Sequence, residues 1–245
     1  MGIVKSLWVG SPLSSQEILS IRSFIANGHE YHLYVYDDVG PVPAGAVLKD
    51  ASEILGREHA HKDKLGTYGF LSDRFRYRLL LAQGGWWVDT DVICVRPFEV
   101  EDDYFFCGET AEMLANTVMK VPPASQLMAV AEANAFAVDE HLSWGLIGPY
   151  LMTKALEHPM FQPLRRFIRP PEAIFPFPHT RWQDIFFKEY DEVAAEIPAG
   201  TYGIHLSNQM IRWTRDAANK KDSNLDPDRL FPANTVYGHF QRKYL

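Results

Sequence analysis

The order of hydrophobic and polar positions along the chain predicts alternating strands and helices. Residues 6–9 form a short apolar run of the kind found in buried strands. Ser14 then stands three residues before Glu17, and apolar residues recur at helical spacing as far as residue 27, so we expect a capped helix. Residues 31–36, which are aromatic and β-branched, predict a second strand. This order favours a right-handed parallel crossover.

The pattern is most distinct between residues 72 and 98. Ser72 is the expected N-cap of a helix that runs to Gly84-Gly85, because an apolar stripe lies between them. Residues 86–88 predict a buried strand that ends in Asp89-Thr90-Asp91, and residues 92–95 resume as a strand.

The rest of the chain predicts further elements of both kinds, and together they indicate one α/β domain with no linker. The expectations are as follows: a loop over residues 39–46, a short helix capped by Asp50, strands at 104–107, 117–121 and 203–206, helices at 122–138 (with Pro122 in the first turn) and 148–156, an irregular region at 159–178 and a polar loop at 216–228.

Composition narrows the class of protein. The chain has 245 residues, 47% hydrophobic and 22% charged, which is typical of a globular domain and excludes wholesale disorder. A net charge of -7 makes nucleic acid an unlikely partner. The two cysteines, Cys94 and Cys107, are too few for a disulfide scaffold and predict buried thiols, with one disulfide as the alternative. The sequence shows neither a signal peptide nor an apolar run of about 18 residues, so we expect a cytoplasmic protein without a transmembrane segment.

Candidate chemistry begins with the two aspartates at the end of residues 86–88. Residues two apart on a strand point the same way, so we expect Asp89 and Asp91 to share one face. Neighbouring carboxylates repel each other unless a cation lies between them, and their hard oxygens suit magnesium, manganese or calcium. The alternative is a solvated turn.

The preceding helix adds a second pair of polar residues. Asp73 and Arg76 lie three apart, on one helix face near its N-terminal end. A carboxylate can bind sugar hydroxyls, and the planar guanidinium can bind carboxylates or phosphates. The alternative is a surface ion pair beside a helix terminus.

The run from Ser72 to Phe98 resembles the DXD-containing sugar transferases of glycosyltransferase family 32. These include initiating mannosyltransferase-like proteins, capsular polysaccharide enzymes and relatives of the clostridial glucosylating toxins. Their signature is Ser-Asp, an Arg three residues on, and then Gly-Gly-x-x-x-Asp-x-Asp, which this chain carries between Ser72 and Asp91.

The resemblance implies an α/β fold of the GT-A type, with a central mixed, mostly parallel sheet flanked by helices. It implies a single domain over residues 1–245, with a donor-binding part at about 1–122 and an acceptor-side part at about 123–245. It also implies a metal-dependent glycosyltransferase that uses a nucleotide-diphosphate sugar and retains the anomeric configuration. The divalent metal would be manganese, with magnesium as the alternative.

Site residues follow from the same alignment. Asp91 would ligate the metal directly, and Asp89 would contact the ribose and the metal. Asp73 and Arg76 would hold the donor sugar and its ribose or phosphate side and complete the catalytic set. Other expected donor contacts are Trp8 near the base, Gly85 and Asn116.

The late segment Tyr202-Gly203-Ile204-His205-Leu206 resembles the His-containing strand of the family. His205 would complete the metal shell or reach the diphosphate, because imidazole suits manganese; the alternative is a structural histidine. Arg212 and Trp213, with Asn208, would form a phosphate-closing loop. Ser143-Trp144-Gly145 before Gly148 resembles a turn beside the sugar pocket, with helix-start punctuation as the alternative.

The predicted reaction is transfer of a hexose or related sugar from a UDP- or GDP-sugar to a hydroxyl of a glycan or lipid-linked acceptor. Polysaccharide biosynthesis, in the cytoplasm or peripherally at the inner face of the membrane, is the expected setting. Two other functions stay open: a metal-dependent phosphohydrolase that uses Asp89 and Asp91, and a non-catalytic nucleotide-sugar binding module.

Overall fold

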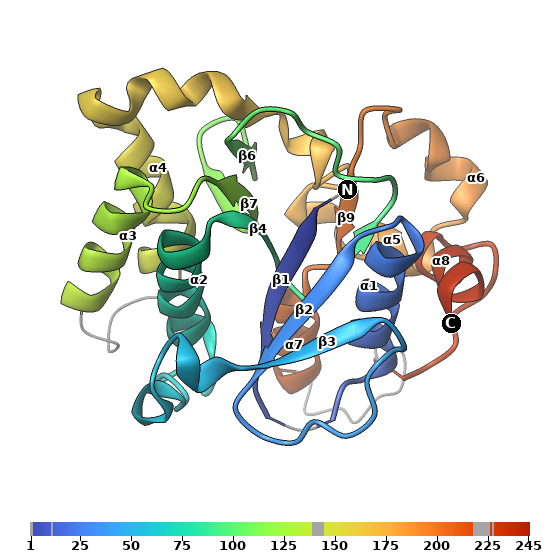
Figure 1. Cartoon of the computed structure of the whole chain (residues 1–245). Coiled ribbons are helices and arrows are strands. Elements are labelled where there is room, and N and C mark those ends of the chain that lie inside the picture. The colour runs from blue at the N-terminus through green and yellow to red at the C-terminus, as the bar shows by residue number, and fades with distance from the viewer. Residues whose placement is uncertain (1, 11, 139–144, 218–225, 227) are drawn as a thin grey trace.

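A seven-stranded sheet forms the centre of the protein in the computed structural model, which describes residues 2–10, 12–138, 145–217, 226 and 228–245 (Figure 1). The strand order is β3-β2-β1-β4-β7-β6-β8. Strands β3, β2, β1 and β4 are parallel to one another, and β7 is antiparallel to both β4 and β6. A second, two-stranded sheet pairs β5 with β9. The predicted α/β class and the mixed, mostly parallel sheet flanked by helices are therefore confirmed.

The elements have the following bounds. The strands are β1 (Ile3–Trp8), β2 (Glu30–Val35), β3 (Ala46–Asp50), β4 (Gly85–Val88), β5 (Val92–Cys94), β6 (Phe105–Gly108), β7 (Leu114–Val121), β8 (Ile168–Arg169) and β9 (Gly203–His205). The α-helices are α1 (Ser15–Ala26), α2 (Gly69–Gln83), α3 (Gln126–Ala137), α4 (Leu151–Glu157), α5 (Asp184–Phe187), α6 (Tyr190–Val193), α7 (Asn208–Ala217) and α8 (Val236–Tyr244). A π-helical turn, η3 (Leu146–Tyr150), precedes α4, and several 3-10 turns lie between α4 and β9.

The chain crosses the sheet in two directions from β1. The connection through α1 leads to β2 on one side, whereas α2 leads back past β1 to β4 on the other. The carboxyl ends of β1 and β4 thus lie at a topological switch point, where open α/β sheets bind their ligands.

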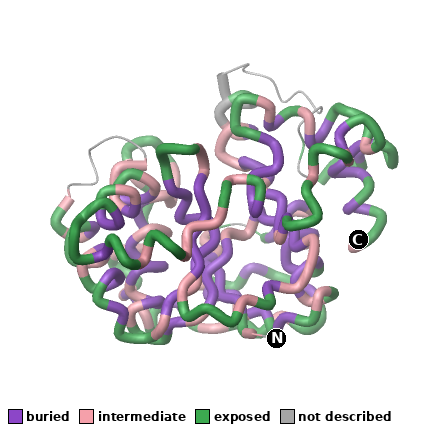
Figure 2. Tube along the Cα trace, turned by 90° about the horizontal axis from the view of Figure 1, so that it is seen from above, coloured by how far each residue is buried: buried purple, intermediate pink, exposed green. Residues whose placement is uncertain are grey.

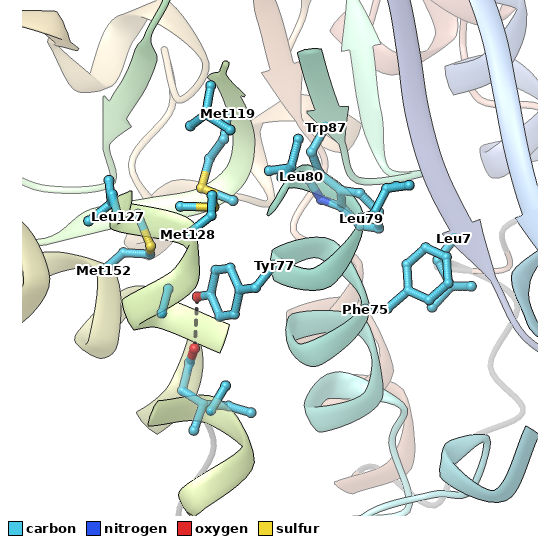
Figure 3. Close-up of a cluster of buried hydrophobic side chains, with 14 of the residues drawn as sticks. Leu7, Phe75, Tyr77, Leu79, Leu80, Trp87, Met119, Leu127, Met128 and Met152 are labelled. Atoms are coloured by element: carbon cyan, nitrogen blue, oxygen red, sulfur yellow. Dashed lines mark hydrogen bonds between the residues drawn. The ribbon is translucent and has the colours of Figure 1, made fainter. Parts of the chain in front are cut away.

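Apolar side chains fill both faces of the sheet. One core joins α2, α3 and α4 to the sheet, and Phe75, Tyr77 and Trp87 are among its fully buried members (Figure 3). A second core lies under α1, and a third joins α1 to α5, α8 and β9. Figure 2 shows these buried segments enclosed by exposed ones. No helix within the described residues is both long and apolar enough to cross a membrane.

Several local predictions are confirmed and others are wrong. Ser14 caps α1 with the expected capping box, and Asp50 caps a short 3-10 turn. Helix α2 starts at Gly69, so Ser72 lies inside the helix and is not its cap. Its hydroxyl instead accepts a hydrogen bond from Arg76.

Two further differences have simple causes. Strand β3 was not expected, because its five residues, partly or fully exposed at the sheet edge, show no alternation of apolar and polar positions. Helix α3 begins at Gln126, after Pro122 and Pro123, so neither proline lies in its first turn. Ser143, Trp144 and most of the predicted loop at 216–228 lie outside the described residues.

Candidate active site

The two aspartates of the motif follow β4 at the switch point. The backbone N–H of Asp89 donates to Thr117 O, which continues the pairing of β4 with β7, and the chain then turns into β5. The two carboxylates are thus brought together by a turn between two strands, and not by alternation along one strand as the spacing predicted. Upstream, Gly84 has φ +59, and a Cβ there would collide with the backbone of Pro123, so glycine is required where α2 ends.

Arg76 contacts the polar residues on one side of the site. Its Nη2 lies 3.0 Å from Asp89 Oδ1 and 3.5 Å from Asp73 Oδ1, and its Nη1 donates to Asn116 O at 2.6 Å. The amide of Asn116 donates to Asp73 Oδ1 at 2.7 Å. We call these residues, Asp73, Arg76, Asp89 and Asn116, the Arg76 side. Because the guanidinium is 4% exposed and bonded within the protein, it serves chiefly to arrange the carboxylates around it.

Burial dominates the electrostatics of the Arg76 side. It raises the pKa of Asp73 despite the attraction of Arg76 and the hydrogen bond from Asn116. It also raises the pKa of Asp89, where repulsion by Asp91 adds to burial and Arg76 opposes it. The side therefore holds two carboxyls against one cation.

His205 gathers the other side of the site. Strand β9 pairs with β5 so that His205 lies opposite Val92, and its Nε2 is 3.3 Å from Asp91 Oδ2. The same Asp91 oxygen accepts the backbone N–H of Asn208 at 3.0 Å, at the start of α7. We call Asp91, His205 and Asn208 the His205 side.

Charge attraction dominates the His205 side. Burial alone would raise the pKa of Asp91, but His205, the Asn208 N–H and Arg212 together lower it. Burial alone would lower the pKa of His205, but Asp91, with smaller contributions from Asp89 and Glu109, raises it overall. The pair is therefore a carboxylate facing an imidazole that holds its proton more tightly than usual.

Asp89, Asp91 and His205 are suited to holding a divalent cation. Each offers one ligand atom, and these atoms lie within 4.8 Å of one another. Two hard carboxylate oxygens and one imidazole nitrogen form a donor set that manganese accepts. Side-chain exposures of 24%, 13% and 17% leave these groups partly open to solvent.

The other predicted site residues lie at different distances from this centre. Trp8 ends β1 at the same edge of the sheet, half-buried. Arg212 lies on α7, close enough for its charge to lower the pKa of Asp91. Trp213 is in α7, but its side chain is outside the described part of the chain. Gly85 is not brought to the site: it starts β4, at the opposite end of that strand from Asp89, with φ +81.

Three residues that the sequence analysis did not assign also belong to the site. The indole of Trp87 donates to Asp89 Oδ1 at 2.8 Å and lies under Arg76, whose guanidinium carbon is 4.9 Å from the ring centroid. The sequence could have indicated this contact, because Trp87 lies two residues before Asp89 and residues two apart on a strand point the same way. Tyr77 accepts from the Asn116 amide at 3.4 Å and donates to Ile147 O, the dashed bond in Figure 3. Glu17, already explained as part of the α1 cap, is hydrogen-bonded to Asn208.

Comparisons with known proteins agree with this arrangement. Residues 14–107 match a family model described as glycosyltransferase sugar-binding region containing DXD motif. Residues 139–225 match a second one, described as alpha 1,4-glycosyltransferase conserved region. These matches confirm the predicted resemblance to DXD-containing sugar transferases and the prediction of a glycosyltransferase.

Individual relatives are more distant. A lactosylceramide 4-alpha-galactosyltransferase of Rattus norvegicus is 25% identical over 161 residues, which cover 62% of this chain. This chain spans only 44% of that protein. The solved structure titled PaToxG Glycosyltransferase aligns with 98% of this chain and 84% of its own, at 13% identity and a TM-score of 0.47, a likeness too distant to bear on function.

Proposed function

We propose that this protein is a metal-dependent glycosyltransferase that moves a hexose or related sugar from a nucleotide-diphosphate sugar to an acceptor hydroxyl. The observation that carries the proposal is the grouping of Asp89, Asp91 and His205 at the switch point of the sheet, beside the buried Arg76 and Asp73. Ligands of open α/β sheets bind at this point. The DXD motif that the family model covers supplies two of the three grouped residues.

In this proposal Asp91, Asp89 and His205 hold a divalent ion, manganese by preference and magnesium as the alternative. Such an ion offsets the charge that builds up on a diphosphate leaving group. Asp91 is the principal ligand, because its lowered pKa keeps it ionised over the whole neutral range.

The Arg76 side supplies the sugar contacts. Asp73 and Asn116 are joined by a hydrogen bond, and Gly148 packs against both, since a Cβ on it would lie 2.8 Å from Asp73 Oδ2. We assign Asp73 to the donor-sugar hydroxyls, because a carboxylate accepts hydrogen bonds from them. Arg76 positions Asp73 and Asp89 and does not itself bind the phosphates, because its N–H groups are directed at protein acceptors.

The donor, the acceptor and the stereochemistry are inferred from the similarity of this chain to known proteins. The second family model and the rat relative both carry α-linkages in their names, and an α-product from an α-linked nucleotide sugar corresponds to retention. We therefore place UDP-galactose first among UDP- and GDP-sugar donors. The acceptor is a glycan or a lipid-linked sugar, and the setting is polysaccharide biosynthesis in the cytoplasm, at the inner face of the membrane when the acceptor is lipid-linked.

Donor binding with and without Mn²⁺ tests the proposal. UDP-galactose, UDP-glucose, UDP-N-acetylglucosamine and GDP-mannose are each added to the wild type and to Asp91→Asn, and thermal unfolding is followed. We expect one nucleotide class to raise the melting temperature of the wild type only when Mn²⁺ is present. Asp91→Asn should not show this stabilisation. Its transfer rate should be lower than that of the wild type by at least ~100-fold, because the substitution removes a charge that faces the reaction.

Asp103→Asn is the matched control. Asp103 is an exposed aspartate just before β6, at the end of the sheet away from Asp89, so its variant should behave as the wild type. Stabilisation of the wild type by none of the donors would refute the proposal and favour the phosphohydrolase. Donor binding without transfer to any acceptor sugar would favour the binding module.

A further inference from the structure

Glu17 is a buried carboxylate to which the proposed reaction assigns no role. It is the third residue of α1 and is 2% exposed. Its Oε2 accepts from the backbone N–H of Ser14 at 2.8 Å and from the Ser14 hydroxyl, which completes the capping box. A capping box needs no more than this one oxygen, and it forms equally well at an exposed helix end.

The second carboxylate oxygen reaches across the fold. Glu17 Oε1 accepts from the side-chain amide of Asn208 at 3.2 Å, 191 residues away in the chain. The backbone N–H of the same Asn208 donates to Asp91 Oδ2. Asn208 therefore connects Glu17, through its side chain, with Asp91, through its backbone.

The backbone before Asn208 needs such a restraint. Ser207 has φ +55, a left-handed conformation that non-glycine residues rarely adopt. Such a conformation persists only where the surrounding contacts fix it. The contacts at this point include the Asn208 hydrogen bonds, the pairing of Leu206 N with Asp91 O at 2.9 Å, and the bond from Met210 N to Ser207 O, also at 2.9 Å.

Arg212 lies one turn further along α7 than Asn208. The contact between Glu17 and Asn208 therefore also restrains the helix that carries Arg212. The orientation of α7 therefore decides where the Arg212 guanidinium stands relative to Asp91.

We propose that Glu17 is a positioning residue that holds the N-terminal turn of α7 against Asp91, and so keeps Asn208 and Arg212 at the donor site. The contact itself stands on geometry, whereas its effect on donor binding rests on the proposed function. It joins the first βα unit to a helix near the other end of the chain. One carboxylate oxygen is bonded at the start of α1 and the other at the start of α7.

Hydrogen exchange of the metal-free protein tests the contact without reference to activity. Asn208→Ala removes the amide but keeps the backbone N–H that reaches Asp91, and Glu17→Ala removes the carboxylate. We expect each variant to speed exchange of the amides in the first turn of α7, roughly threefold to tenfold. The double variant should exchange no faster than the faster single variant, because both remove the same contact.

Ser14→Ala is the matched control. It removes the hydroxyl that caps α1 but leaves the bond between Glu17 and Asn208. Exchange in α1 should rise and exchange in α7 should stay at the wild-type rate. An unchanged α7 in Asn208→Ala, or an α7 equally affected by Ser14→Ala, would overturn the proposal.

Titration with Mn²⁺ and UDP then connects the contact to the site. Asn208→Ala should weaken binding of UDP in the presence of Mn²⁺ by roughly threefold to tenfold, whereas Ser14→Ala should not. Equal affinity in all three proteins would overturn the role in donor binding. If the wild type binds neither Mn²⁺ nor UDP, the proposed function fails, and the exchange rates alone decide whether Glu17 holds α7.

Discussion

The two sides of the site balance their charges in different ways. On the Arg76 side, a permanently charged guanidinium lies between Asp73 and Asp89, and an amide and an indole N–H add to its hold on them. On the His205 side, Asp91 faces an imidazole, which can give up its proton, and the first backbone N–H of a helix. The Arg76 side is fixed by internal hydrogen bonds, whereas the His205 side can exchange the imidazole proton for a cation.

This difference divides the work of the site. A carboxylate that is already paired with arginine gains less from a metal, so Asp89 is the weaker of the two aspartate ligands and also helps to hold the Arg76 side together. A carboxylate whose partner can be deprotonated is free to bind an ion together with that partner. We therefore expect substitutions on the Arg76 side chiefly to lower the stability of the fold, and substitutions on the His205 side chiefly to weaken metal binding.

Arg76→Ala should have the largest effect on stability. It leaves Asp73 and Asp89, whose side chains are 14% and 24% exposed, without their cation, and the loss of a partner from a fully buried pair costs about 3–5 kcal/mol in the free energy of unfolding, which is the upper bound here. Urea denaturation measures the loss. Arg78→Ala is the control, because Arg78 lies on the same helix but forms a half-exposed pair with Glu132, worth at most about 1 kcal/mol. Equal losses in the two variants would contradict the special role of Arg76.

The deficit of Arg76→Ala should also depend on pH. The pKa values of Asp73 and Asp89 are already raised by burial, and loss of the cation raises both further. A carboxyl of this kind contributes stability below its unfolded pKa and loses it as pH rises through its folded pKa. The variant should therefore regain stability, relative to the wild type, as pH falls from neutral towards the ordinary aspartate pKa. A deficit that grows on acidification would contradict this account.

The comparison also explains how much the sequence could predict. Three of the four residues of the Arg76 side lie between residues 73 and 89. Helix spacing alone brings Asp73 and Arg76 together, whereas Asp89 meets them because α2 packs beside β4. Strands β1, β2 and β4 and helix α1 with its cap followed from local patterns, whereas the mixed sheet was implied by the resemblance. Asn116 comes from β7, a neighbour of β4, and was named from the resemblance.

The His205 side could not be derived from spacing. Asp91 and His205 meet because β5 and β9 pair across more than a hundred residues, and no local pattern encodes that register. His205 was named only through the resemblance. Glu17 was hidden for a related reason: its capping role explained the residue fully at the level of sequence, whereas its contact with Asn208 depends on how α1 and α7 pack.

His205→Ala tests the second half of the comparison. It removes one of three grouped ligand atoms, so the dissociation constant for Mn²⁺ should rise at least tenfold, given that even outer partners of metal ligands contribute about 10–100-fold. Calorimetric titration measures it, with His179→Ala, which changes an exposed histidine, as the control. The unfolding midpoint should move far less than in Arg76→Ala. A large stability loss with unchanged Mn²⁺ affinity would reverse the assignment of the two sides.

Gly148→Ala separates sugar contacts from metal binding. The new Cβ would lie 2.8 Å from Asp73 Oδ2 and 3.1 Å from Asn116 Nδ2, so Asp73 must move. We expect the transfer rate to fall about tenfold while Mn²⁺ affinity stays unchanged, because a small misplacement of a positioning group is costly to the rate. Gly200→Ala, where a Cβ meets nothing within 4 Å, is the control. Weaker Mn²⁺ binding in Gly148→Ala would mean that the two sides are not separable.

Trp87→Phe should have the smallest effect on the site. It removes the indole N–H that Asp89 accepts at 2.8 Å but keeps an aromatic ring under Arg76. Asp89 still has the Arg76 guanidinium at 3.0 Å, so donor affinity should fall only about twofold to threefold, within the usual range for one hydrogen bond. Donor titration in the presence of Mn²⁺ measures the change. A loss as large as that of His205→Ala would show that Arg76 alone does not hold Asp89 in place, and the distinction between the two sides would then no longer hold.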